Sequence, residues 1–240
     1  MLLTLALAAA ALVVPVPVSE SAPAPVAYPA PACTAWGRQG RQLYADDFSG
    51  PLGQWIAEMV PKPGSSITTA GGHAVLDVAA GATLWFRHEL SGNLLITYKR
   101  KVVLGGGRND RLSDFNHFWM ASDPARASLF SRDGTFEHYD GLSLYYLGIG
   151  GNTNTTTRFR KYGAGARVLV SEQNDPGRLL TANHDYAVQI AVYQGCTRVL
   201  VDGREFVNYR DPAPLTHGYF GFRTTWSHQE IGDFKIYQLD

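Results

Sequence analysis

The ten residues 111–120 (RLSDFNHFWM) place a guanidinium, an amide, an imidazole and an indole within one short segment. Side chains of an extended strand alternate between its two faces. One face would carry Arg111, Ser113, Phe115, His117 and Trp119, and the other Leu112, Asp114, Asn116, Phe118 and Met120. We expect the first face to line a ligand groove, because Leu112, Phe118 and Met120 make the better core. With a register shifted by one residue, the face that carries Asn116 is exposed instead.

A second segment, residues 142–162, reads as a strand, a loop rich in Gly, Asn and Thr, and a returning strand. Alternation puts two guanidiniums and a phenol on one face of the returning strand, opposite Phe159. Guanidinium groups offer forked donors that match a carboxylate. The alternative is a solvated outer face that carries two arginines. The candidate ligand contacts of this segment are Tyr145, Tyr146, Arg158, Arg160 and Tyr162.

Together the two segments hold the side chains that β-elimination from a uronic acid requires. The reaction needs a group that neutralises the carboxylate, a base for the C5 proton and an acid for the leaving oxygen. His117 is the expected base, and Tyr146 or Tyr145 the expected acid. Asn116 or Arg158 would neutralise the carboxylate. The expected substrate-binding residues are Arg111, Trp119, Tyr145, Arg160, Tyr162 and His228.

Two other functions stay open at this point. A glycosidase needs two carboxylates at a set separation, often two or four residues apart on one strand, and no such pair stands out. A glycoside hydrolase with dispersed carboxylates is therefore one alternative. A non-catalytic carbohydrate-binding module, in which aromatic rings stack on sugars, is the other. The sequence also lacks a Gly-x-Ser-x-Gly motif and a phosphate-binding loop, which leaves no basis for α/β-hydrolase or nucleotide chemistry.

The composition indicates which elements position these residues. The 240 residues carry 21 Lys+Arg and 21 Asp+Glu, so no net charge attracts nucleic acid or an anionic membrane. With 45% hydrophobic residues the chain can bury a core, and its 25 Gly and 13 Pro favour short strands joined by turns. We expect a single monomeric domain, without a required cofactor, over residues 41–240.

Alternating or β-rich stretches recur along this domain and predict about a dozen strands. The longest are residues 94–104, 111–120, 142–149, 155–162 and 186–193, and residues 73–78 and 82–87 are two shorter, separate stretches. Asp202-Gly203 predicts a two-residue hairpin turn, and residues 124–130 form the one predicted helix, with Asp123 as its cap. This pattern predicts an all-β fold, a two-sheet antiparallel jelly-roll sandwich of the concanavalin A-like type.

The N-terminal region predicts secretion. Residues 1–20 contain an apolar run with the length of a signal-peptide core, and residues 21–40 form a Pro/Ala-rich spacer. Cys33 and Cys196 suit an oxidising compartment and are expected to form a disulfide, with two unpaired thiols as the alternative. Asp47 and Asp233, near the two ends of the domain, could meet at a structural calcium ion, against simple turn capping.

Four stretches carry a resemblance to a known family. They are residues 44–55 (YADDFSGPLGQW), 109–124 (NDRLSDFNHFWMASDP), 145–158 (YYLGIGGNTNTTTR) and 218–226 (GYFGFRTTW). They resemble a family of secreted domains of unknown function, similar to the concanavalin A-like jelly rolls encoded among systems that degrade rhamnogalacturonan and other plant polysaccharides. More distantly the chain is similar to jelly-roll polysaccharide lyases, without their Gln-Ile-His or Arg-x-Glu-x-Arg motifs. The resemblance implies an acidic polysaccharide or oligosaccharide as partner.

Overall fold

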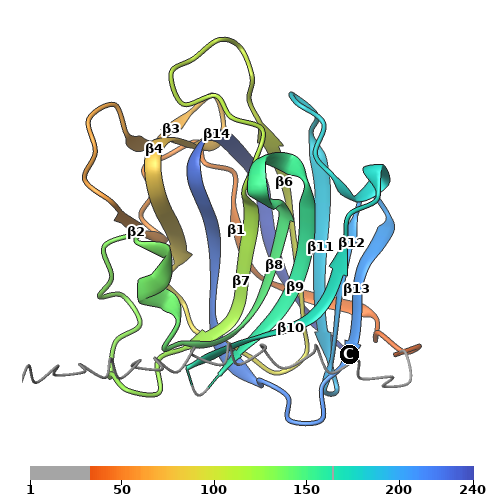
Figure 1. Cartoon of the computed structure of the whole chain (residues 1–240). Helices are drawn as coiled ribbons and strands as arrows, with labels where there is room; N and C mark the ends of the chain where they lie inside the picture. The colour runs from red at the N-terminus through yellow and green to blue at the C-terminus, as the bar shows by residue number, and fades with distance from the viewer. Residues whose placement is uncertain (1–32, 164) are drawn as a thin grey trace, which may run out of the picture.

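The computed structural model describes residues 33–163 and 165–240, and this part of the chain is built almost entirely of antiparallel strands (Figure 1). The predicted signal peptide and the spacer residues 21–32 lie outside the described residues. The strands are β1 (Gln39–Asp46), β2 (Trp55–Met59), β3 (Ser66–Ala70), β4 (His73–Phe86), β5 (Leu90–Ser91), β6 (Leu94–Val102), β7 (Phe115–Ser122), β8 (Ser143–Gly150), β9 (Thr156–Gly163), β10 (Ala166–Gln173), β11 (Tyr186–Tyr193), β12 (Cys196–Val201), β13 (Arg204–Arg210) and β14 (His217–Leu239). Three single turns of helix complete them: η1 (Phe136–Tyr139), α1 (Gly151–Asn154) and η2 (Pro176–Arg178). Within the described residues no helix is long and apolar enough to span a bilayer.

The strands follow the order β10-β9-β8-β7-β14-β6-β11-β12-β13, with β1, β2, β3, β4 and β5 attached through β14 and β4. The 23-residue strand β14 links the two halves of this curled sheet. Its first part pairs with β7 and β4, and its last part pairs with β6 and β1. The predicted all-β jelly-roll fold is thus confirmed.

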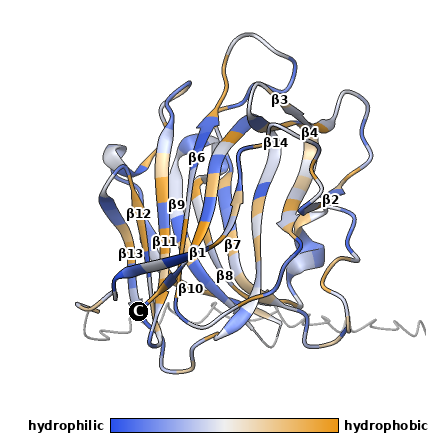
Figure 2. Ribbon diagram, turned by 180° about the vertical axis from the view of Figure 1, so that it is seen from behind, coloured by the Kyte–Doolittle hydropathy of each residue, from blue (hydrophilic) through white to orange (hydrophobic). Residues whose placement is uncertain are grey.

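The main core lies between the two halves of the curled sheet and is unusually aromatic. Trp55, for example, stacks on Phe222 with ring centroids 5.4 Å apart and meets Phe234 edge-on at 4.8 Å. Figure 2 shows how hydrophobic and hydrophilic residues alternate along the strands that enclose this core. Each buried aromatic side chain removes a large apolar surface from water, which is the main stabilising contribution to such a sandwich.

The predicted disulfide between Cys33 and Cys196 is present. It ties the start of the described chain to β12, and Asn208 of β13 holds the Cys33 backbone with one accepted and one donated hydrogen bond. The bridge closes a loop with a sequence separation of 163 residues. Loop-closure entropy for a bridge of that span gives a stabilisation of about 5 kcal/mol.

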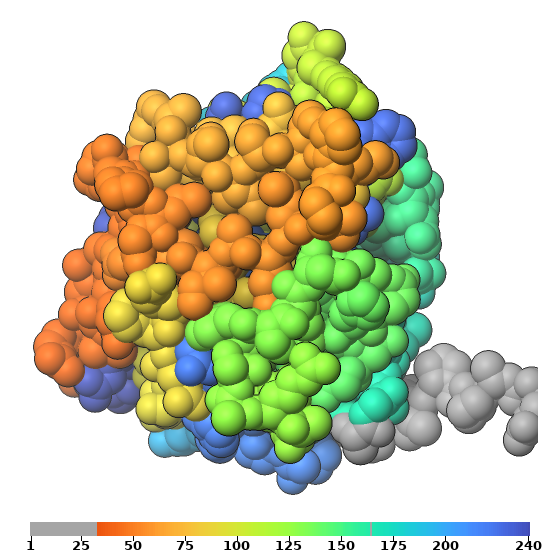
Figure 3. Space-filling view, turned by 90° about the vertical axis from the view of Figure 1, so that its left-hand side faces the viewer, coloured from red at the N-terminus to blue at the C-terminus, as the bar shows by residue number. Residues whose placement is uncertain are grey.

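The predicted helix over residues 124–130 is wrong. Asp123 does accept a hydrogen bond from the Ala125 backbone, as a cap would, but its other carboxylate oxygen binds the Arg132 guanidinium at 2.6 Å. This buried ion pair folds the segment back as an irregular loop. The loop packs beside the segment of β2 and β3, as Figure 3 shows for the green and orange residues, and Glu58 accepts a hydrogen bond from the Arg132 backbone.

Strand β4 is longer than the sequence predicts, because Gly81 does not end it. A Cβ atom at Gly81 would lie 2.2 Å from the carbonyl oxygen of Gly134 and 2.8 Å from the Arg223 guanidinium. The glycine therefore allows the 123–142 loop and an arginine of β14 to approach the strand closely. The loop and the arginine together form one wall of the pocket described below.

Candidate functional site

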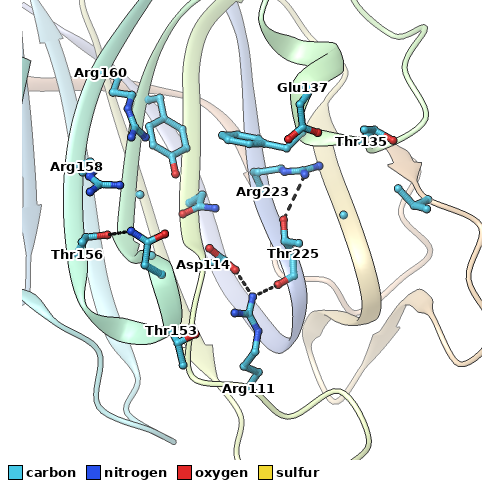
Figure 4. A pocket seen from close by; sticks show the side chains of 18 residues that line it. Arg111, Asp114, Thr135, Glu137, Thr153, Thr156, Arg158, Arg160, Arg223 and Thr225 are labelled. Atoms are coloured by element: carbon cyan, nitrogen blue, oxygen red, sulfur yellow. Dashed lines mark hydrogen bonds and ion pairs between the residues drawn. The ribbon is translucent and has the colours of Figure 1, made fainter. Parts of the chain in front are cut away.

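A pocket of about 600 Å³ lies on the face of the β9-β8-β7-β14-β4 sheet that points away from the main core (Figure 4). The pocket, hereafter the groove, is also bounded by the 123–142 loop and the turn of α1. Its charged lining residues in the described part of the chain are Arg111, Asp114, Glu137, Arg158, Arg160 and Arg223. The lining thus carries four guanidiniums and two carboxylates.

Antiparallel register places the groove residues in rows across the sheet. Asn116 of β7 pairs with Gly148 of β8 on one side and with Arg223 of β14 on the other. Gly148 in turn pairs with Arg158 of β9. Directly paired residues share a face of the sheet, so these four positions form one row. Tyr146 belongs to the next row, where Arg160 is its partner on β9.

Gly148 is the floor of the groove. A Cβ atom there would lie 2.1 Å from the Tyr146 hydroxyl and 2.8 Å from Oδ1 of Asn116, so only glycine leaves room for both polar groups. The Asn116 side chain is 3% exposed, and its Oδ1 has no hydrogen-bond partner within the described residues. Buried polar atoms are normally paired. An unpaired amide oxygen at the floor of a pocket therefore indicates a place where a ligand binds.

Two arginines of β9 form one side of the groove, and they differ in their partners. Arg158 is held by Glu172 of β10, with 2.7 Å between Nε and the carboxylate. Arg160 makes neither a hydrogen bond nor an ion pair with any described residue, and its guanidinium lies 5.5 Å from the centre of the Tyr146 ring. Burial raises the pKa of Tyr146, so its hydroxyl is protonated at neutral pH. This side of the groove thus offers Arg158, which is ion-paired, Arg160, which is not, and the Tyr146 hydroxyl as a hydrogen-bond donor.

Arg223 forms the opposite side and is fully buried. It donates hydrogen bonds to the Thr83 hydroxyl and the Gly134 carbonyl, and its guanidinium lies 5.3 Å from the centre of the Phe136 ring. No carboxylate of the described chain forms an ion pair with it, and its Nε has no acceptor. Burial lowers the pKa of this guanidinium. Arg223 is not among the predicted site residues, although an arginine within an apolar strand is a signal in the sequence.

One end of the groove is formed by Arg111 and Asp114, which bind each other. Both precede β7, and Asp114 has a positive φ of 59°, so the alternation expected from residue 111 onward breaks before the strand begins. The Arg111 guanidinium also binds the carbonyl oxygens of Thr225 and Trp226. Burial raises the pKa of Asp114, and the nearby Arg111 opposes that effect.

A second buried arginine supports the floor from the core side. Arg100 of β6 donates a hydrogen bond to the backbone carbonyl of Asn116 at 2.8 Å and to that of Arg223 at 3.1 Å. Its Nε binds Gln229 at 2.7 Å. Burial lowers the pKa of Arg100 to about 10, so it remains charged at neutral pH. Arg100 thereby fixes the backbone of two groove residues.

The expected groove positions of His117 and Trp119 are wrong. Both side chains are fully buried on the core side of β7. Trp119 stacks on Phe159 at 5.8 Å and donates to the Thr197 hydroxyl. His117 lies 3.1 Å from the Leu147 carbonyl, and burial holds its pKa well below the ordinary value of 6.5. The other face of β7 lines the groove, and there Phe118 is covered by the 123–142 loop, which the sequence pattern could not reveal.

Three further candidates lie away from the groove. Tyr145 points to the core side, where its hydroxyl donates to Asp211 at 2.5 Å. Tyr162 shares the face of Arg160, as expected, but is fully buried in the apolar cluster beneath the 123–142 loop. His228 pairs with Asp110 at 3.1 Å and is not a lining residue. Of the predicted site, the structure brings together Asn116, Tyr146, Arg111, Arg158 and Arg160.

The two aspartates of the predicted calcium site have other partners. Asp47 accepts a hydrogen bond from the Ser49 backbone, which lowers its pKa, and Asp233 binds Lys235. Within residues 33–163 and 165–240 no group of three or more His, Cys, Asp or Glu side chains could hold a metal ion. The calcium site stays a prediction.

Solved structures of similar fold cover most of the chain. A protein of unknown function with a galectin-like fold from Bacillus subtilis is 19% identical with a TM-score of 0.68, and the match covers 84% of this chain and 98% of that one. The carbohydrate-binding module CBM66 from the same organism is 12% identical with a TM-score of 0.54 (77% and 96% covered). An endo-β-1,3-glucanase from Pyrococcus furiosus is 11% identical with a TM-score of 0.57 (83% and 95%). At these identities the likeness shows the fold alone. No curated protein matches the chain.

Fold and groove define the class: a galectin-like jelly-roll domain with an arginine-lined groove on the outer face of one sheet. A family model described as a domain of unknown function, DUF6250, matches residues 76–234. The chain therefore belongs to the DUF6250 family.

Proposed function

We propose that this chain is a carbohydrate-active protein whose groove binds an acidic saccharide. The observation that carries the proposal is Arg223, a fully buried guanidinium that lines the groove without an ion pair from the described residues. A buried guanidinium without a carboxylate partner is costly even when it is hydrogen-bonded, and the cost falls when an anion binds beside it. A uronate carboxylate or a sulfate is the anion that a sugar would supply.

The remaining groove residues support an anionic sugar. Arg160 has no acceptor in the described chain and is free to bind a carboxylate through its fork. Asn116 and the Tyr146 hydroxyl offer polar contacts at the floor, as sugar hydroxyls require. A volume of about 600 Å³ is within the range of small-molecule sites. The similar solved structures include a carbohydrate-binding module and glucanases, which favours a sugar over another anion.

The test is a binding measurement with matched ligands and variants. Uronate and sulfated oligosaccharides are compared with neutral ones of equal length by calorimetry, with pectic fragments in the panel because of the family resemblance. We expect binding of the acidic ligands that weakens as salt rises, since salt screens charge pairs. Arg160→Gln should weaken it about 10- to 100-fold, as loss of a charged hydrogen bond of roughly 1.5–3 kcal/mol requires. Arg210→Gln, an exposed arginine outside the groove lining, is the control. Equal binding of neutral ligands would contradict the proposal.

β-Elimination of a uronate polymer is a second candidate, favoured by the Tyr146 hydroxyl beside Asn116 and Arg160. In this reaction a base takes the C5 proton, the C4–O bond breaks, a C4–C5 double bond forms and the leaving oxygen gains a proton. Tyr146 suits the last role because it is protonated. The imidazole expected as base lies on the other side of the sheet, so the binding function has the stronger support. Ultraviolet absorbance of an unsaturated uronate would indicate elimination, and saturated new reducing ends would indicate hydrolysis.

We also propose that the protein works as a monomer outside the cytosol. The Cys33–Cys196 disulfide supports an oxidising compartment. Gel filtration of the mature domain tests the monomer, and analysis of culture medium tests secretion.

A further inference from the structure

Trp226 stands out on the surface of the described chain. Its side chain is 49% exposed, and Val168 is the only other large hydrophobic residue in the exposed class there. The other four tryptophans of the sequence have other environments: Trp55, Trp85 and Trp119 are buried, and Trp36 packs against Arg198. A single exposed apolar residue needs no explanation by itself. The backbone conformation at Trp226, however, indicates that its exposure has a function.

Trp226 lies at an irregularity in the sheet. The pairing of β14 with β4 shifts register there, because Thr225 pairs with Gly81 and Ser227 with Val78, so β4 carries one extra residue opposite Trp226. Its φ is +45°, in the left-handed region that side chains of its size rarely adopt. Bulges re-aim a side chain and occur often beside functional sites. A strained backbone that exposes an indole, rather than burying it, indicates a role in binding rather than in packing.

The indole also lies next to the groove. Thr225, the preceding residue, lines the groove. Arg111 lines it too, and its guanidinium lies 5.3 Å from the centre of the Trp226 ring. The same arginine donates a hydrogen bond to the Trp226 carbonyl at 2.8 Å, which holds the backbone at this residue. The indole therefore adjoins the end of the groove at which Arg111, Asp114 and Thr225 lie (Figure 4).

We propose that Trp226 is a second sugar subsite, on which the apolar face of a saccharide unit stacks while a neighbouring acidic unit occupies the groove. This inference rests on the proposed function and deepens it. The C–H groups on one face of a pyranose ring stack on aromatic rings, and an exposed indole is a large platform for such a contact. The ligand is accordingly an oligosaccharide or polymer with at least one unit beyond the groove, rather than a monosaccharide.

Trp226→Gly tests the subsite, because glycine adopts a positive φ without strain. We expect this variant to bind acidic tetrasaccharides and longer chains at least 10-fold more weakly than the wild type and acidic monosaccharides equally well. Its melting temperature should equal or exceed that of the wild type. Val168→Ala removes the other exposed apolar side chain and should bind as the wild type does. Long ligands should also protect tryptophan fluorescence from acrylamide quenching in the wild type but not in the variant.

The outcomes separate this inference from the function on which it rests. Unchanged binding of long chains by Trp226→Gly overturns the subsite, and so does a loss of binding that merely follows a lower melting temperature. If the wild type binds neutral chains only and the variant loses that binding, the acidic-saccharide proposal fails and the subsite stands. If the wild type binds no saccharide of either kind, both are overturned.

Discussion

Gly148→Ala is the most direct test of the groove floor. The new methyl carbon would lie 2.1 Å from the Tyr146 hydroxyl, where ordinary contact begins at 3.4 Å, so the two must separate by about 1.3 Å (3.4 minus 2.1). The tyrosine ring cannot move freely, because Phe118, Phe136 and Tyr162 surround it at 5.8, 6.1 and 5.9 Å. Either the ring is forced toward the groove or the β8 backbone shifts away from β7.

Both adjustments have a cost that can be measured. Overpacking by one methyl group destabilises a protein by about 1–3 kcal/mol. For a domain of this size each kcal/mol lowers the melting temperature by roughly 2–4 °C. Ligand affinity should fall further, by at least about tenfold or 1.4 kcal/mol, because the methyl group fills the space between Asn116 and Tyr146.

The assay is calorimetric binding of an acidic oligosaccharide together with thermal unfolding. Gly141→Ala is the matched control, since no atom lies within 4 Å of a Cβ built there. It should leave affinity unchanged. If Gly148→Ala binds like the wild type and unfolds like Gly141→Ala, the floor does not contact the ligand and the placement of the saccharide is wrong.

Two further predictions concern stability. Burial holds the folded-state pKa of His117 well below the unfolded value of 6.5. The stabilisation from the neutral, buried imidazole is therefore complete above about pH 6.5, and it is lost as the pH falls toward the folded-state pKa. The loss should approach about 1.4 kcal/mol per pH unit and disappear in His117→Gln, as denaturant unfolding at pH 5 to 7 will show; an equal slope in the variant contradicts it. Replacing Cys33 and Cys196 by serine should lower the unfolding free energy by about 5 kcal/mol in the chain-entropy treatment, and a change below 1 kcal/mol would show that the reduced chain keeps compensating structure.

Local sequence patterns were enough to predict the fold. The stretches over residues 94–104, 142–149 and 186–193 are alternating or β-rich, and β6, β8 and β11 lie there. The hairpin at Asp202-Gly203 joins β12 and β13 as predicted. The pattern did not show that residues 73–78 and 82–87 form one strand. Continuity through Gly81 depends on Arg223 and the 123–142 loop, which are distant in sequence.

The site was predicted only in part, and the errors on β7 have one cause. Asn116, Tyr146 and the two arginines of β9 are in the groove, but the wrong face of β7 was preferred. That preference assumed that apolar residues mark one core. The structure has a second apolar cluster, with Phe118 beneath the 123–142 loop, so both faces of β7 are apolar in part. No local pattern distinguishes a strand covered on both faces from a strand with one core.

The groove carries an excess of positive charge that the net charge of the chain does not reveal. The chain as a whole is neutral, with 21 residues of each sign, so composition gave no reason to expect an anionic partner. Glu172 compensates Arg158, and Asp114 compensates Arg111. Arg160 and Arg223 are left without an ion pair in the described chain, and they lie on opposite sides of the groove (Figure 4). Charges in a pocket are screened less than those on an open surface, so the proposed preference for an acidic saccharide is compatible with a neutral protein. A saccharide that lies across Gly148 can neutralise both only if it carries an anionic group.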